Sequence, residues 1–176
     1  MMASMAPAFE GSASAVAAVD LGSMHREHYR SLVRLASLLI DDVGTCEEIV
    51  QDAFVRVWRR GPALRDDDRL PAYLRSTVLN GARSHLRHSK VARRHLQPAP
   101  DPTEGPDARP LVGDQARVLA ALRSLPHRQR EVLALRYYLD LTEADIAATL
   151  GISAGSVKTH AHRGLATLAE RLEDLR

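Results

Sequence analysis

The sequence contains little of what builds disulfide-linked, β-sheet or membrane-spanning proteins. Cys46 is the only cysteine among 176 residues, so no disulfide framework is possible and a reducing cytoplasm is the expected location. Aromatic residues make up 4% of the chain and alternating β-branched runs are absent, which argues against a sheet protein. No stretch has the about 20 apolar residues that a membrane helix needs. Ala, Leu and Arg are abundant instead, and the sequence predicts an all-α fold.

A targeting signal is also missing from the start of the chain. Residues 1–20 are rich in Ala, Ser, Gly and Met, but they have neither a basic beginning nor a continuous apolar centre. We expect these residues to be a disordered leader. The length of the chain allows one medium domain or two small ones.

The chain has no large excess of charge of one sign, because its formal net charge is +2. The distribution of charge is more informative. Residues 69–95 contain seven Lys or Arg and no Asp or Glu, whereas residues 114–176 contain nine basic and eight acidic residues. The middle of the chain therefore has the charge pattern typical of nucleic-acid binding.

Residues 142–168 predict a helix-turn-helix. Thr142 and Asp145 form a capping-box start for the first helix, and Gly151 provides a left-handed stop. The second helix restarts at Ser153, a favoured N-cap residue. Two helices joined by so short a turn cross steeply, and the second can enter a DNA major groove.

The second of these helices has one apolar and one polar face. The apolar positions, expected to point inward, are Val157, Ala161, Leu165 and Leu168. The opposite face carries Ser156, Thr159, His160 and Arg163, flanked by Lys158 and His162. These residue types suit phosphates and base edges, with Arg163 the best candidate for a bidentate bond to guanine. The alternative is a solvated face of an ordinary helix bundle.

Short motifs in the sequence also suggest two other kinds of site. Residues 151–155 (GISAG) fit the nucleophile elbow of serine hydrolases, but such an elbow follows a strand and here follows a predicted helix. A metal site is suggested by His85 with His88, or by His160 with His162. Only the first pair has helical i, i+3 spacing and no further ligands converge on either pair, so we expect no metal.

The first half of the chain predicts three helices. One covers about residues 21–40. A second opens with Thr45 and Glu48 as a capping box, carries an apolar stripe that includes Phe54, Val57 and Trp58, and ends at Gly61–Pro62. A polar loop over residues 63–70 follows, and Pro71 then starts a third helix with the basic run on its exposed side. Tyr73 on this helix suits stacking on a single-stranded base, or is a core residue; both interpretations stay open.

Residues 97–112 (QPAPDPTEGPDARPLV) contain five prolines and cannot continue a helix. We therefore expect two small helical domains, residues 21–96 and 114–176, joined by a Pro-rich linker over residues 97–113. Nothing in the sequence requires the two domains to touch.

Three segments, in order, carry a resemblance to a known family: HYRSLVRLASLLIDDVGTCEEIVQDAFVRVWRR, LPAYLRSTVLNGARSHLRH and LRSLPHRQREVLALRYYLDLTEADIAATLGISAGSVKTHAHRGLATL. They resemble the region 2 core, the promoter-contacting helix that follows it and region 4 of bacterial RNA polymerase sigma factors of the extracytoplasmic-function (ECF) class, group 4 of the sigma-70 family. Within that class the chain is similar to the actinobacterial SigE-like subgroup.

The resemblance implies a transcription initiation factor, not an enzyme, that needs no cofactor. It would bind core RNA polymerase, read a minus 35 element as duplex DNA and capture a minus 10 element as a melted strand. The implied minus 35 contacts are Ser156, Lys158, Thr159, His160 and Arg163. The implied minus 10 contacts are the 63–70 loop, Tyr73, Asn80, Arg83, Arg87 and Lys90. The polymerase clamp would meet Glu48, Gln51 and Asp52, and the polymerase flap Leu122, Leu125 and Val132.

Exposed polymerase-docking faces would also suit an anti-sigma protein as a partner. A second class of function is an autonomous helix-turn-helix repressor or activator, with the first half as a dimerisation or sensing module. Such a protein gains nothing from a basic, Tyr-bearing helix directly after an acidic one, and binding to core polymerase separates the two classes.

Overall fold

The structure is a computed structural model that describes residues 21–60, 70–95 and 113–173. Within these residues it contains seven α-helices, one short π-helix and no strand, which confirms the all-α fold. In chain order the helices are α1 (Leu21–Ser37), α2 (Val43–Arg60), α3 (Leu70–His95), α4 (Asp114–Ser124), α5 (His127–Leu133), η2 (Ala134–Tyr138), α6 (Glu143–Leu150) and α7 (Ala154–Glu173).

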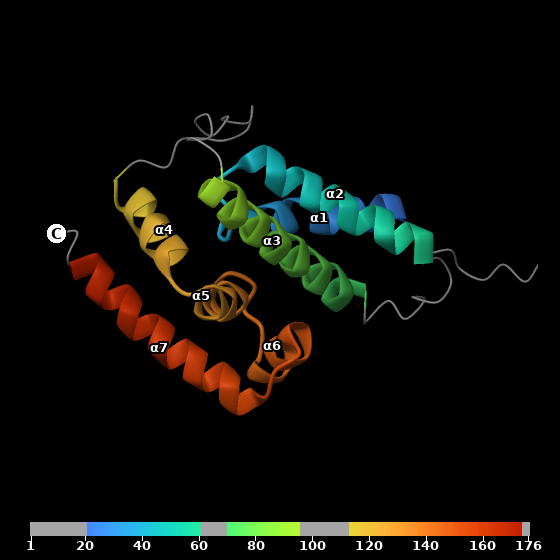
Figure 1. Cartoon of the computed structure of the whole chain (residues 1–176). Helices are drawn as coiled ribbons and strands as arrows, with labels where there is room; N and C mark the ends of the chain where they lie inside the picture. The colour runs from blue at the N-terminus through green and yellow to red at the C-terminus, as the bar shows by residue number, and fades with distance from the viewer. Residues whose placement is uncertain (1–20, 61–69, 96–112, 174–176) are drawn as a thin grey trace, which may run out of the picture.

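Helices α1, α2 and α3 form the first lobe, in which each helix packs against the other two (Figure 1). Its centre is apolar because each helix turns one apolar side inward; fully buried side chains include Leu35, Val50, Leu74 and Leu79. The 26 residues of α3 make it the longest helix of the lobe. It presents one side to α1 and α2 and another to the rest of the molecule.

Helix α2 begins two residues earlier than the sequence predicts. The carboxylate of Asp42 accepts a hydrogen bond of 2.7 Å from the backbone N–H of Thr45, so Asp42 is the capping residue. The predicted capping box of Thr45 and Glu48 is therefore wrong. Aspartate caps a helix at least as well as threonine, and the earlier residue took the role. Hydrogen bonds from the Thr45 side chain and backbone also lower the pKa of Asp42.

Helices α4 to α7 form the second lobe. Helix α7 packs against α4, α5 and α6, and η2 continues directly from α5. The inward side of α7 carries Val157, Ala161 and Gly164, whereas Leu165 is 42% exposed. The prediction that Leu165 points inward is therefore wrong. Gly164 takes its place because it lets α7 approach α5 closely: a Cβ there would lie 3.1 Å from Leu133 Cδ1.

The two lobes are in direct contact. Helix α3 packs against α6, and α1 packs against η2, so that the core residues of both lobes form one continuous cluster (Figure 1). The sequence pattern did not require this contact. The contact between the lobes places the C-terminal end of α1 and one side of α3 against α4, α5 and α6. Side chains on that side of α3 can therefore bond to the second lobe.

Several predictions concern other parts of the chain. The leader (residues 1–20), nearly all of the 63–70 loop and nearly all of the 97–113 linker lie outside the described residues. Among the helices that are described, none combines the length and the apolar character of a membrane-spanning segment.

Candidate nucleic-acid interface

The turn between α6 and α7 has the geometry that its sequence predicts. Thr142 Oγ1 accepts a hydrogen bond of 3.2 Å from the backbone N–H of Asp145 and caps α6. Gly151 ends α6 in the left-handed region, with φ 64°. Ser153 Oγ then accepts a hydrogen bond of 3.1 Å from the backbone N–H of Ser156 and caps α7. The helix-turn-helix is therefore confirmed, and Ser153 acts as a helix cap after a helix, which rules out the hydrolase elbow.

The polar face of α7 is accessible at most of its predicted contact residues. Lys158, Thr159 and Arg163 are exposed, and Ser156 and His160 are half-buried. The hydroxyl of Thr159 donates to the carbonyl of Gly155 at 3.0 Å, so in this arrangement it is engaged by its own helix. Lys158 and Arg163 are thus the cations that this face offers to a phosphate or a base edge.

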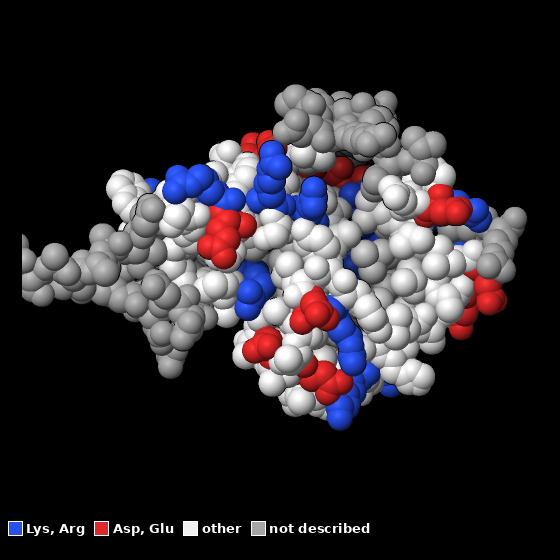
Figure 2. Space-filling model, turned by 180° about the vertical axis from the view of Figure 1, so that it is seen from behind, with Lys and Arg blue, Asp and Glu red and all other residues white. Residues whose placement is uncertain are grey.

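An acidic residue of α6 lies beside the cation at the front of α7. Glu143 Oε2 lies 3.7 Å from Lys158 Nζ, and Glu143 Oε1 accepts a hydrogen bond of 3.4 Å from Arg136. Lys158 remains 70% exposed, so the pair is weak and screened by solvent. On the face drawn in Figure 2, Lys and Arg side chains likewise lie beside Asp and Glu, with broad uncharged areas between them. Local charge balance of this kind predicts modest DNA affinity for the chain alone.

The basic side of α3 brings together four of the predicted strand contacts. Asn80, Arg87 and Lys90 are exposed, and Arg83 lies between them, half-buried. Asn80 Oδ1 accepts a hydrogen bond of 2.7 Å from Arg83, which holds the amide and the guanidinium together. Tyr73 is half-buried and packs against the core, so the structure supports the core interpretation of that ring.

Arg83 is also bound to the other lobe. Its Nε and Nη2 donate to the two carboxylate oxygens of Glu131 at 2.5 and 3.0 Å. Glu131 on α5 is 2% exposed and accepts a further hydrogen bond of 3.2 Å from Arg128. A buried carboxylate is tolerated only when such partners compensate its charge. Sequence analysis missed this pair, because no pattern links two residues 48 positions apart.

The predicted clamp contacts lie on the open side of α2. Glu48, Gln51 and Asp52 are exposed, as expected. The same helix exposes Trp58 at 68% and Val55 at 39%, although the sequence placed Trp58 in the inward apolar stripe. That prediction is wrong because Phe54 and Val57 already supply the inward positions of this turn.

The predicted flap contacts lie deeper than expected. Leu125 is 2% exposed and Val132 is 0% exposed, so both are core residues of the second lobe and not surface contacts. Leu122 is half-buried. Helical spacing identified these residues as apolar, but it could not separate the side that packs in the core from a side left for a partner.

Neither histidine pair forms a metal centre within the residues that the structure describes, where no group of three or more potential ligands converges. His85 instead lies 3.1 Å from the hydroxyl of Ser89. Cys46 is buried among apolar residues, and this burial raises the pKa of its thiol to about 12.

Comparison with known proteins identifies both lobes. Residues 24–91 match the family sigma-70 region 2, and residues 115–168 match sigma-70 region 4. The chain is 32% identical over 148 residues to an RNA polymerase sigma-E factor of Streptomyces avermitilis, a match that covers 84% of this chain and 82% of that protein. It is 30% identical over 149 residues to the ECF RNA polymerase sigma factor SigM of Mycobacterium tuberculosis, a match that covers 85% of this chain and 75% of that protein.

The chain belongs to the ECF class of RNA polymerase sigma factors. The family resemblance read from the sequence is thereby confirmed, including its likeness to sigma-E factors of Streptomyces. By its family this sigma factor is a transcription initiation factor and not an enzyme.

Two solved structures have a similar fold, and both are complexes of two proteins. One is the sigma factor RpoE in complex with the anti-sigma factor NepR from Bartonella quintana, with a TM-score of 0.72 and 22% identity over 89% of this chain and 99% of that one. Another is CnrH in complex with the cytosolic domain of CnrY, with a TM-score of 0.63 and 26% identity over 88% of each chain. The former likeness shows the fold alone.

Proposed function

We propose that this sigma factor binds core RNA polymerase and directs promoter-specific initiation by two separate DNA contacts. Helix α7 reads the minus 35 element as duplex, and α3 captures the melted minus 10 strand. The observation that carries the proposal is the exposed polar face of α7, which follows a short turn capped at Thr142, Gly151 and Ser153. Within it, Arg163 contacts a base edge, and Lys158 and Thr159 contact phosphates.

The minus 10 contact uses the basic side of α3. Arg83, Arg87 and Lys90 follow the backbone of the melted strand, and Asn80 offers an amide to a base edge. Unstacking a base costs a few kcal/mol, so a flipped base needs both cations and an enclosing surface. The 63–70 loop directly before α3 is proposed to supply that surface with Tyr73. Tyr73 packs against the core and is half-buried, so only its exposed part is available for this contact.

The polymerase contact uses the open side of α2. Glu48, Gln51 and Asp52 supply polar contacts to the clamp, and Trp58 with Val55 supplies an apolar anchor next to them. In the second lobe Leu122 is the flap contact that we retain, because Leu125 and Val132 are core residues. Polymerase tethers both lobes along a promoter and so raises the affinity of two weak DNA contacts.

An anti-sigma protein is a further proposed partner. The similar structure of RpoE is a complex with the anti-sigma factor NepR, and that of CnrH is a complex with the cytosolic domain of CnrY. For these proposed contacts the protein would have to be in the cytoplasm, where polymerase and promoter DNA are.

Run-off transcription with core polymerase on a library of promoters tests the proposal. We expect transcripts that depend on the added chain, and we expect Arg163→Ala to reduce them while polymerase binding persists. Glu170→Gln on the exposed side of α7 is the matched control. Specific binding to duplex DNA without any association with core polymerase would contradict the proposal and favour an autonomous repressor or activator.

A further inference from the structure

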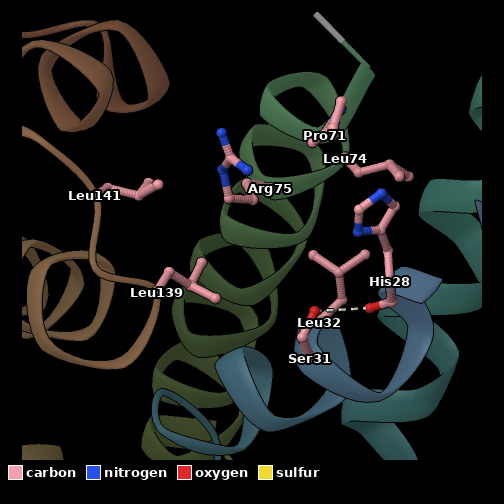
Figure 3. Close-up of a pocket in the computed structure, with 8 residues that line it drawn as sticks. All are labelled: His28, Ser31, Leu32, Pro71, Leu74, Arg75, Leu139 and Leu141. Carbon is pink, nitrogen blue, oxygen red and sulfur yellow. Dashed lines mark hydrogen bonds between the residues drawn. The ribbon is translucent and has the colours of Figure 1, made fainter. Parts of the chain in front are cut away.

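A small cavity lies where α1 and the start of α3 meet the segment that joins η2 to α6. Its volume is about 130 Å³. Most of its lining is apolar and consists of Leu32, Pro71, Leu74, Leu139 and Leu141, whereas the polar lining consists of His28, Ser31 and Arg75. In the view of Figure 3, Arg75 extends from α3 on the side where Leu139 and Leu141 lie, and the His28 ring lies on the other side. No residue assigned above to polymerase or DNA lines this cavity.

The α1 side of the cavity has most of its polar atoms already bonded. Ser31 Oγ donates to the carbonyl of His28 at 3.0 Å, and the Tyr138 hydroxyl donates to the carbonyl of Ser31 at 3.3 Å. Burial raises the pKa of the Tyr138 phenol, so the hydroxyl keeps its proton for this bond. The side chains that remain for a ligand are therefore the guanidinium of Arg75 and the ring of His28.

Arg75 differs from the other half-buried arginines in its lack of a bonded acceptor. Arg83 donates to the carboxylate of Glu131, and Arg123 donates to the carbonyl of Ser37 at 2.6 Å. Arg75 forms neither kind of bond among the residues that the structure describes, and its Nε is buried there without a hydrogen-bond partner. A buried cationic group without an acceptor is unfavourable, and an anion in the cavity would remove that cost.

The charges around Arg75 do not supply that anion. Burial lowers the pKa of Arg75, and the negative charge of Asp145 on α6 acts in the opposite direction. The carboxylate of Asp145, however, accepts a hydrogen bond of 2.6 Å from the hydroxyl of Thr142 at the start of α6. A guanidinium stays protonated even when its pKa is lowered, so Arg75 presents a positive charge to the cavity.

The shape and lining of the cavity define the class of ligand. An apolar cavity of about 150 Å³ holds one benzene molecule, so a slightly smaller one takes a ligand of about five or six heavy atoms. A carboxylate matches the planar fork of a guanidinium and accepts two bonds from it. The leucine side chains that form the rest of the lining favour a short hydrocarbon tail over a fully hydrated ion such as phosphate.

We propose that this cavity binds a short aliphatic monocarboxylate. The carboxylate accepts hydrogen bonds from Arg75, and the ring of His28 is a second donor on the α1 side. The tail packs against Leu32, Leu74 and Leu139. Because the ligand contacts α1, α3 and the segment before α6 together, its binding stabilises the packing of these three segments. The site does not depend on the function proposed above.

The first test measures binding of butyrate to the full chain by isothermal titration calorimetry. We expect saturable binding in the millimolar range or tighter, as is usual for a ligand of this size, and a rise in the thermal unfolding midpoint. Butyramide has the same size without the charge and should bind at least about tenfold more weakly, since it offers no anion to Arg75. Equal affinities for butyrate and butyramide, or no saturable binding of butyrate, would overturn the proposal.

Two further probes separate this site from simpler kinds of binding. Inorganic phosphate supplies an anion without a tail, and octanoate supplies a tail too long for the cavity. Both should bind at least about tenfold more weakly than butyrate, because neither fills the cavity and meets Arg75 together. Phosphate that binds as tightly as butyrate would indicate a general anion site, and octanoate that does so would indicate an apolar surface; either result would contradict the proposal.

Variants then place the binding in this cavity. Arg75→Gln should weaken butyrate binding at least about tenfold, since it removes the charge that meets the carboxylate. Arg56→Gln makes the same change at an exposed position on α2 and should leave the affinity unchanged. Leu141→Phe keeps Arg75 and fills part of the cavity, so it should also abolish binding. Butyrate affinities that neither Arg75→Gln nor Leu141→Phe reduces would overturn the site.

Two controls keep these results interpretable. Circular dichroism checks that each variant is folded, and Leu141→Phe provides an independent answer if Arg75→Gln weakens the fold. Run-off transcription separates the two proposals of this article's Results by outcome: a chain that binds butyrate but does not support transcription contradicts the proposed function alone. A chain that supports transcription and does not bind butyrate contradicts the carboxylate site alone.

Discussion

The two lobes present their candidate DNA contacts differently. In the second lobe, the cations of α7 are exposed and belong to a face that the rest of the molecule leaves open. In the first lobe, the central cation of α3, Arg83, is bound to Glu131 of the other lobe. The structure therefore leaves the proposed duplex-contacting residues of α7 open, whereas it engages Arg83 among the proposed strand-contacting residues of α3.

The lobes also differ in how tightly their helices cross. In the first lobe, a Cβ on Gly81 of α3 would lie 2.7 Å from Ile49 Cγ2 of α2. In the second, a Cβ on Gly164 would meet Leu133 and Gln129 at 3.1 to 3.3 Å. A methyl group at the first crossing requires the Ile49 side chain or its helix to move, whereas the neighbours at the second need to yield by only a few tenths of an ångström.

Gly81→Val should have the largest effect on stability. The branched side chain overlaps Ile49, and overpacking at such a crossing costs about 3 kcal/mol. Denaturant unfolding followed by circular dichroism measures the loss. Gly164→Ala should change stability by no more than about 1 kcal/mol, since the gain in helix propensity offsets the tight contact. Equal losses at the two glycines would show that the crossings are equally tight.

Arg163→Ala should weaken binding to minus 35 duplex in the polymerase complex by about 1–3 kcal/mol, the value of a good base contact. Arg87→Ala on α3 is the matched change in the first lobe. It should leave duplex binding unchanged and reduce the permanganate reactivity of the melted minus 10 bases. Gel-shift titration on fully duplex templates and on templates with a single-stranded minus 10 region separates the effect on duplex binding from the effect on the melted strand. An Arg163→Ala protein that loses polymerase affinity and keeps its promoter preference would contradict the assignment.

Asp42→Ala should destabilise the first lobe by about 1 kcal/mol, because it removes the N-cap of α2. Thr45→Ala should cost less, since the capping hydrogen bond uses the backbone N–H of Thr45, which alanine also has. Thermal unfolding of both variants distinguishes the observed cap from the capping box that the sequence suggested. A larger loss for Thr45→Ala would restore the capping box.

The smallest expected effect is a change of stability with pH. Hydrogen bonds from Thr45 lower the pKa of Asp42 below its usual value of 3.8. The contribution of this carboxylate is therefore complete above about pH 4 and is lost as the pH falls through the lowered pKa. Asp42→Asn should unfold with a shallower pH dependence in acid than the wild-type chain. Identical acid unfolding curves for Asp42→Asn and the wild-type chain would show that another carboxylate determines the loss of stability in acid.

Local signals predicted much of the second lobe. The cap at Thr142, the left-handed Gly151 and the cap at Ser153 depend on residues within a few positions of one another, so the turn could be read directly. Predictions that had to choose between two residues close together in the same helix were less accurate. Asp42 displaced Thr45 as a cap, and Gly164 displaced Leu165 from the inward face, because helix spacing distinguishes such neighbours by only a fraction of a turn.

Contacts between the lobes could not be predicted. The partners Arg83 and Glu131, or Arg123 and Ser37, are 48 and 86 positions apart, and the helices that bring them together are joined through residues outside the described ones. Helical spacing identified Leu125 and Val132 as apolar positions, but it did not show that the core of the second lobe would bury both side chains. Such features depend on the tertiary arrangement, which propensity and periodicity do not encode.

The π-helix η2 sets the angular position of its own last residues relative to α5. A π turn holds one residue more than the α turn it interrupts. Deleting Arg136 from η2 would let α5 continue as a regular α-helix and would rotate the downstream chain by about 100°. Tyr138 would then turn away from Ser31, and the segment that leads to α6 would leave the helix in another direction. The number of residues in η2 thus decides whether Tyr138 reaches α1.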